Sequence, residues 1–277
     1  MASLKDLRSR IKSTKSTERI TSAMKMVAAA KLKKSEDRAA RARPYAEKME
    51  TMITALSSQM AGDAPALLRG RDGGKGKVLL LVVITSDRGL CGGFNGAMVK
   101  EVRKAIYKHQ AGGGQVKLLL IGRKGINLLR REFQKNIVDS FEELSKPIPQ
   151  FDKAEMVAQK IATLFDKQEI DQCQLFFTKY VSALTQMVTP LSLIPFQAAI
   201  HHGGDAKNAT SKTSDKKSDA NRALTEFEPD EATILQSLLP QNLAVQVYRG
   251  FLESFASEQG ARMTAMDNAT RNARDMI

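Results

Sequence analysis

The chain has 277 residues, of which 42% are hydrophobic and 26% are charged, and its Lys and Arg residues exceed its Asp and Glu residues by 13. These values exclude wholesale disorder and low-complexity classes, and they leave room for one or two globular domains with a sizeable core. The longest purely apolar run, from Val78 to Ile84, is far shorter than the roughly 20 residues of a transmembrane helix, so no direct membrane span is expected.

The N-terminal segment is predicted to form one long basic helix. Residues 1–60 hold 14 Lys and Arg against 6 Asp and Glu, more than half of the chain's positive excess. Ser3 is a suitable N-cap, and apolar residues recur every three or four positions as far as the break at Gly62. Pro44 is a point where this helix can kink. At about 1.5 Å per residue, the helix would be a rod roughly 80–85 Å long.

A rod of this length needs a partner helix, and the C-terminal segment can supply one. From Gln241 to Ile277 there is no proline, and apolar residues step by three or four positions. The two ends of the chain are therefore predicted to form an antiparallel coiled coil. Small residues near the predicted seam would let the two backbones approach closely; they are Thr14, Thr17, Gly250 and Gly260.

The middle of the chain is predicted to form an α/β domain with a mostly parallel sheet. Short apolar runs alternate with amphipathic stretches, a pattern typical of β-α-β units. The predicted strands are Val78–Ile84, Val116–Ile121, Cys173–Tyr180 and Met187–Ile194, and the predicted helices cover 95–110, 124–132 and 153–167. The last two strands can pair as a hairpin.

The predicted organisation has four parts. Residues 1–69 form an N-terminal shaft helix, 70–200 the α/β domain, 201–224 a flexible polar insertion, and 225–277 a C-terminal shaft helix. The insertion is predicted from its lack of apolar periodicity and its richness in Lys, Ser, Asp and Ala. The fold class is thus α/β, with a long antiparallel coiled coil of the terminal helices added to the central domain.

A glycine-rich turn, Thr85–Asn95, follows the first predicted strand, where phosphate-binding loops occur. It lacks the Lys-Ser or Lys-Thr pair of a P-loop, and the second strand ends at Gly122 and Arg123 without the acidic residue of a dinucleotide site. We therefore predict a structural turn, with a nucleotide site as the alternative.

The reactive side chains give no catalytic pattern. Cys91 and Cys173 are too few for a disulfide framework or a four-ligand zinc site, which favours a reducing compartment. Cys91 has no histidine close in sequence, so a buried, inert thiol is preferred over a nucleophile. The pair His201 and His202 lacks further metal ligands at useful spacing. The chain is predicted to be noncatalytic, with no metal and no cofactor.

A basic stretch, Lys31–Lys34 followed by Arg38, Arg41 and Arg43, has three interpretations. It can neutralise nucleic-acid phosphates, form a solvated helix face, or face acidic surfaces of a protein partner. Aromatic residues are only 5% of the chain, with no tryptophan, and no nucleic-acid-binding motif is present. No nucleic-acid partner is expected.

Three separated blocks carry a family resemblance. The first is Ile20–Leu32 and the second is the turn Thr85–Asn95; the third combines Glu228–Asp230, Gln246–Tyr248 and Ser257–Thr270. In this order they closely resemble the gamma subunit of F-type ATP synthases. The blocks cover both ends and the centre of the chain.

The resemblance implies the central shaft of a rotary motor. Proton flow would turn this shaft in one direction, and ATP hydrolysis would turn it in the other. The coiled coil would sit inside a ring of three alpha and three beta subunits, and the α/β domain would stand on the c-ring with the epsilon subunit. Delta would be a partner only within the larger complex. Nucleotides would bind the beta partners and not this chain. The complex would lie on the cytoplasmic face of a bacterial inner membrane, with this chain attached peripherally.

The resemblance also implies specific contact residues. Met24 and Arg262 fall where the shaft meets the acidic lever segment of the beta subunits, with Lys25 and Lys31 nearby. If Met24 and Arg262 lie at one height, Ile277 faces about residue 9 across the coil.

Overall fold

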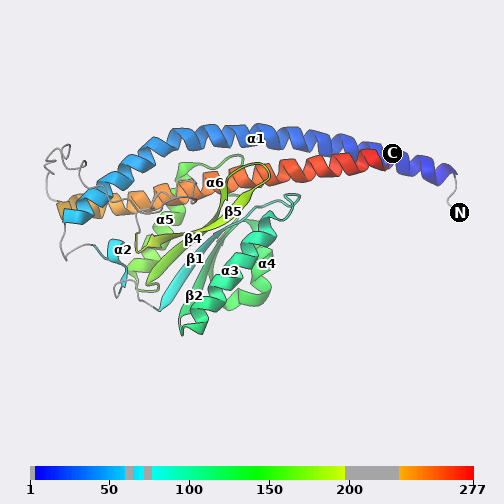
Figure 1. Ribbon diagram of the computed structural model, residues 1–277. Coiled ribbons are helices and arrows are strands. Elements are labelled where there is room, and N and C mark those ends of the chain that lie inside the picture. The colour runs from blue at the N-terminus through cyan, green and yellow to red at the C-terminus, as the bar shows by residue number, and fades with distance from the viewer. Residues whose placement is uncertain (1–3, 60–64, 72–76, 197–230) are drawn as a thin grey trace, which may run out of the picture.

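The computed structural model describes residues 4–59, 65–71, 77–196 and 231–277, and its architecture is a long helical pair attached to an α/β domain (Figure 1). Helix α1 (Leu4–Gln59) and helix α6 (Glu231–Asp275) run antiparallel, so the start of α1 and the end of α6 lie toward the same end of the pair. With 56 residues at about 1.5 Å each, α1 is about 84 Å long. The predicted coiled coil of the two chain ends is confirmed.

Both long helices contain a proline in their interior. Pro44 lies within α1, and Pro240 lies within α6, which therefore extends beyond the proline-free stretch that begins at Gln241. A proline in a helix interior removes a hydrogen bond and costs about 3 kcal/mol. Around these two positions, one apolar cluster joins the helices and offsets that cost; it contains Ala46, Met49, Ile53, Leu56, Leu235, Leu239 and Val245.

The central sheet has five strands in the order β3-β2-β1-β4-β5. The strands are β1 (Val78–Ile84), β2 (Gln115–Ile121), β3 (Ile137–Phe141), β4 (Gln172–Tyr180) and β5 (Gln186–Ile194). All neighbours pair in parallel except β4 and β5, which pair antiparallel. The mostly parallel sheet and the terminal hairpin are therefore confirmed, whereas β3 is an additional strand that the sequence analysis did not identify.

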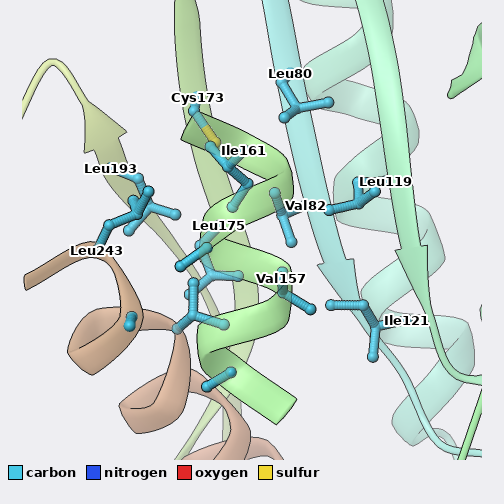
Figure 2. Packing of buried hydrophobic residues seen from close by; sticks show 14 of the residues in the cluster. Leu80, Val82, Leu119, Ile121, Val157, Ile161, Cys173, Leu175, Leu193 and Leu243 are labelled. Carbon is cyan, nitrogen blue, oxygen red and sulfur yellow. The ribbon is translucent and has the colours of Figure 1, made fainter. Parts of the chain in front are cut away.

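Helices cover both faces of this sheet. They are α2 (Ala66–Arg69), α3 (Phe94–Ala111), α4 (Arg123–Phe133) and α5 (Phe151–Asp166). Helices α3 and α4 pack on one face, while α5 and the shaft helix α6 pack on the other. Figure 2 shows the second face, where side chains of β1, β2 and β4 meet Val157 and Ile161 of α5 and Leu243 of α6. Helix α6 is thus both half of the shaft and a covering helix of the sheet.

The register of the coil differs from the expected one near the ends of the chain. With Met24 and Arg262 at one height, Thr21 would face residue 265, but its hydroxyl oxygen lies 2.7 Å from that of Thr270. Two ion pairs agree with this register: Arg274–Glu18 at 2.7 Å and Lys25–Asp267 at 2.6 Å. In this part of the coil the register is shifted by about five residues, or about 7.5 Å along the axis. Nearer the middle of the pair, the Ser35 hydroxyl donates to the Leu252 oxygen at 3.1 Å, which agrees with the expected register.

The glycines of α6 also lie elsewhere than predicted. Gly250 faces Leu175 and Ile84 of the sheet, and Gly260 faces the ring of Tyr180. Neither faces α1, so the close approach that they permit is between α6 and the sheet, and not between the two shaft helices.

The proposed polar insertion at 201–224 lies outside the described residues, as do residues 60–64 and 72–76 near the predicted domain boundary. Within the described ranges, no helix has the length and apolar character needed to cross a bilayer.

Candidate functional site

A groove of about 810 Å³ lies where the coil meets the glycine-rich turn after β1. We call it the shaft groove and define it by Met24, Val27 and Lys31 of α1, Leu90 of the turn, and Arg262 of α6. Helix α1 provides an apolar wall, and α6 and the turn provide most of the charged groups. The groove therefore combines an apolar surface with a basic edge.

Three of the four predicted contact residues line this groove. Met24 and Lys31 are half-buried on α1, and Arg262 lies on the opposite wall. Lys25 does not line the groove; its ammonium group forms an ion pair with Asp267, which also binds Arg271. The structure thus brings Met24, Lys31 and Arg262 together, whereas Lys25 lies outside the groove and pairs with Asp267.

Arg262 is enclosed and fully engaged with its own chain. Its Nη1 atom lies 2.6 Å from Oε1 of Glu258, one helical turn earlier, and its side chain is 11% exposed. Its Nη2 atom donates to the backbone oxygens of Arg88 at 3.4 Å and Gly89 at 3.2 Å. Arg262 therefore ties α6 to the turn.

Glu258 is the buried partner of this arrangement. Burial raises the pKa of its carboxyl group, and the Arg262 guanidinium and the Lys31 ammonium act in the opposite direction. A buried carboxylate needs such partners, because an uncompensated buried charge is strongly destabilising. The sequence analysis did not identify Glu258, although its i, i+4 spacing from Arg262 was the available signal.

The glycine-rich turn is held by side-chain hydrogen bonds. The Ser86 N–H donates to Oδ1 of Asn95 at 3.1 Å, and the Asn95 amide donates to Oγ of Ser86 at 2.8 Å. Oδ1 of Asp87 accepts from the N–H groups of Arg123 and Glu143, which begin the regions after β2 and β3. This network fits the predicted structural turn, because the polar groups around it bind one another.

Cys91 lies inside this network. The thiol is buried, and the Asn95 amide lies 3.3 Å from its sulfur. Burial raises the pKa of the Cys91 thiol, which disfavours the thiolate that a nucleophile requires. Burial also raises the pKa of the Cys173 thiol. The prediction of a buried Cys91 thiol is confirmed.

Leu90 marks the exposed tip of the turn. It has a φ of 63°, in the left-handed region that favours glycine, and its side chain is 62% exposed. Non-glycine residues in this region carry strain, which is common where a side chain is presented for a function. Beside it on α1, Ile20 and Val27 are also exposed. Exposed apolar groups with a basic edge suit an acidic, amphipathic protein segment.

The described residues contain no cluster of three or more His, Cys, Asp or Glu side chains that could hold a metal ion. His201 and His202 lie outside that part of the chain.

Comparisons with known proteins agree on one family. A family model described as ATP synthase matches residues 3–277. The ATP synthase gamma chain of Rhodospirillum rubrum is 50% identical over 279 residues, covering 100% of this chain and 90% of that protein. The gamma chain of Parvibaculum lavamentivorans is 45% identical, with the same coverage.

Solved structures give the same result for the fold. The central stalk and c-ring structure of the Tetrahymena thermophila mitochondrial ATP synthase contains a chain with a TM-score of 0.64 and 28% identity; the match covers 90% of this chain and 99% of that one. A rotor chain of the Euglena gracilis mitochondrial enzyme has a TM-score of 0.61 at 17% identity, covering 97% and 91%, and shows the shared fold.

Proposed function

The chain belongs to the ATP synthase gamma-chain family and is a central-stalk rotor subunit, and we propose that it acts as a noncatalytic shaft between a c-ring and catalytic partner subunits. The observation that carries this proposal is the long α1–α6 coil projecting from a compact α/β domain, with the shaft groove where the two meet. Such a shape suits a rigid axle with a separate base.

The proposed partners are three alpha and three beta subunits around the coil, with epsilon and the c-ring at the α/β domain and delta only within the larger complex. The basic character of residues 1–60 supports contact with acidic partner surfaces. The proposed location is the cytoplasmic face of a bacterial inner membrane, where the chain is held through the complex. In this proposal, residues 1–69 and 225–277 form the shaft, and residues 70–200 form the base.

The noncatalytic assignment is supported by what lies at the edge of the sheet where the parallel strands have their carboxyl ends. In open α/β sheets, ligands bind at this edge where the strand order reverses, which here is beside β1. Helix α6 lies there, and Arg262 donates to the turn that a nucleotide phosphate would approach. We therefore propose that nucleotide chemistry belongs to the beta partners and that this chain holds no cofactor.

We propose that the acidic lever segment of each beta subunit meets the shaft at Met24, Lys25, Lys31 and Arg262. The shaft groove supports direct contact with Met24 and Lys31. Lys25 is 45% exposed beside Asp267, so its charge can reach a partner along the coil. Arg262 is enclosed, and its part in this contact is to hold the turn that carries Leu90.

The proposed mechanism is conformational. A rotating asymmetric shaft presents the groove to one beta subunit at a time and thereby favours one of its nucleotide-site conformations. Contacts of methionine and other apolar groups suit this task, because each is weak and adaptable and can be broken as the shaft turns.

Copurification tests this proposal. A tagged form of this chain, expressed with its partners, is expected to bring down alpha and beta subunits in a ratio of three to three to one. Recovery of the tagged chain without them, under conditions that preserve the complex, would contradict the proposed role.

A further inference from the structure

Strand β4 extends beyond the end of its parallel neighbour β1. Its ladder with β1 ends at the pair Val83 and Phe176, but β4 continues to Tyr180. On its other side, β5 pairs with β4 along this whole length. Since alternate residues of a strand direct their backbone groups to the same side, Thr178 and Tyr180 need partners in the space beyond the end of β1.

Helix α6 supplies those partners through side chains. The Thr178 N–H donates to Oγ of Ser254 at 3.0 Å, and the Ser257 hydroxyl donates to the Thr178 oxygen at 2.9 Å. The Tyr180 N–H donates to Oε2 of Glu253 at 3.0 Å. We call Glu253, Ser254 and Ser257 the α6–β4 ladder.

The two serine bonds lie in the interior. Ser254 is 3% exposed and Ser257 is fully buried. A short serine side chain can reach a strand backbone only if the helix lies very close, and glycines make that approach possible. A Cβ atom added at Gly250 would lie 2.7 Å from the side chain of Leu175, and one at Gly260 would lie 3.1 Å from the ring of Tyr180.

A further hydrogen bond continues this connection along α6 toward its C-terminal end. The Thr264 hydroxyl donates to the Ala183 oxygen at 2.9 Å, in the turn between β4 and β5. The β4–β5 hairpin is thus hydrogen-bonded to α6 over three helical turns. Apolar packing has no preferred direction, but hydrogen bonds do, so these bonds oppose rotation of α6 about its own axis against the sheet.

We propose that the α6–β4 ladder is the torque-bearing connection between the α/β domain and the shaft. The inference rests on the proposed function, in which the c-ring turns the domain and the shaft acts on the beta subunits. The ladder residues are positioning residues: they fix the angle between the two parts and touch no nucleotide.

The test uses the assembled ATP synthase containing the double variant Ser254→Ala and Ser257→Ala. The head is fixed to a surface and held in a paused state, and a nanoparticle on the α/β domain reports the angular fluctuation of that domain. We expect the angular variance to rise at least twofold. The matched control is Ser237→Ala, which removes an exposed hydroxyl from the same helix and is expected to leave the variance unchanged.

Hydrogen exchange separates this inference from the proposed function. In the free full-length chain, the amide of Thr178, which loses its acceptor, should exchange at least tenfold faster in the double variant. Faster exchange with unchanged angular variance would overturn the torque-bearing role, and so would unchanged exchange. Failure of the unmodified chain to assemble would count against the proposed function, while the exchange result would still report on the ladder.

A milder pair of variants covers the case in which the double variant does not assemble. Glu253→Ala removes the acceptor for the Tyr180 N–H, whereas Glu253→Gln keeps an oxygen there. We expect the alanine variant to raise the angular variance and the glutamine variant to restore most of the original value. Equal behaviour of the two would overturn the role of this bond.

Discussion

The hydroxyl oxygens of Thr21 and Thr270 lie 2.7 Å apart in the buried seam between α1 and α6, although 249 residues separate them in the chain. This contact fixes the height of one shaft helix against the other, because neither side chain is long enough to bridge a shifted register.

Cysteine cross-linking checks that register. With Cys91 and Cys173 replaced by serine, the pair Thr21→Cys and Thr270→Cys should form a disulfide under mild oxidation, since contacting side chains at these positions place the Cβ atoms within roughly the range that a disulfide requires. The control pair is Thr21→Cys with Ala265→Cys, which corresponds to the register expected from the family resemblance. Efficient cross-linking of the control pair alone would show that the five-residue shift is wrong.

The Glu258 carboxyl group predicts a pH dependence of stability. Burial raises its pKa in the folded chain above the unfolded value near 4.5, so the folded state binds the proton more tightly. The free energy of unfolding of the unmodified chain should therefore fall, relative to Glu258→Gln, as pH rises from 4.5 through the raised pKa. Denaturant titrations at several pH values measure this difference. Parallel curves for the two proteins would contradict the prediction.

Charge reversal in the shaft groove should uncouple the complex. Lys31→Glu places a negative charge at the proposed contact with an acidic lever, and we expect ATP-driven proton pumping in membrane vesicles to fall severalfold. Lys34→Glu is the matched control, because Lys34 is exposed on the same helix and does not line the groove. Equal losses in the two variants would indicate a general charge effect instead of a specific contact.

The close approach of α6 to the sheet predicts opposite effects for two glycine substitutions. Gly250→Ala would force a methyl group against Leu175 and Ile84, and we expect a loss of about 1–2 kcal/mol in the free energy of unfolding, since overpacking outweighs the gain in helix propensity. Gly96→Ala in α3 meets no atom within 4 Å and should stabilise the chain by about 0.5–1 kcal/mol. Thermal or denaturant unfolding gives both values, and a stabilising Gly250→Ala would refute the close contact.

Calorimetry checks the noncatalytic assignment. The isolated chain should give no saturable heat of ATP binding at physiological concentration, because the turn after β1 lacks the P-loop lysine and hydroxyl and is bound by Arg262. Saturable binding to this chain alone would overturn the assignment.

The sequence predicted the elements whose burial is uniform. Strand β1 lies between α-helices on both faces, so all of its residues are apolar and its limits could be predicted correctly. Strand β3 lies at the sheet edge and contains Asp139 and Ser140, and it is only partly buried, so it has no continuous apolar pattern. Edge strands of this kind depend on pairing with a neighbour, which the local sequence does not reveal.

The shaft register could not be predicted because α6 packs against α1 and against the sheet at once. All of the residues from Asn242 to Val247 are buried, so a helical period identifies the helix but not which side faces which partner. The candidate contact residues were partly predictable: the groove contains Met24, Lys31 and Arg262. The buried pairing of Arg262 with Glu258 and the turn depends on tertiary contacts that no single segment encodes.

The pairing of the two chain ends also determines the order in which the molecule can be made. A ribosome that adds roughly 5–20 residues per second needs about 12–50 s to add the 249 residues that follow Thr21 as far as Thr270. During that time α1 is complete, but the seam residues Ala28 and Leu32 have no α6 to cover them. The first helix to emerge is therefore the last to find its partner, and the nascent chain must be kept from aggregating until synthesis is nearly finished.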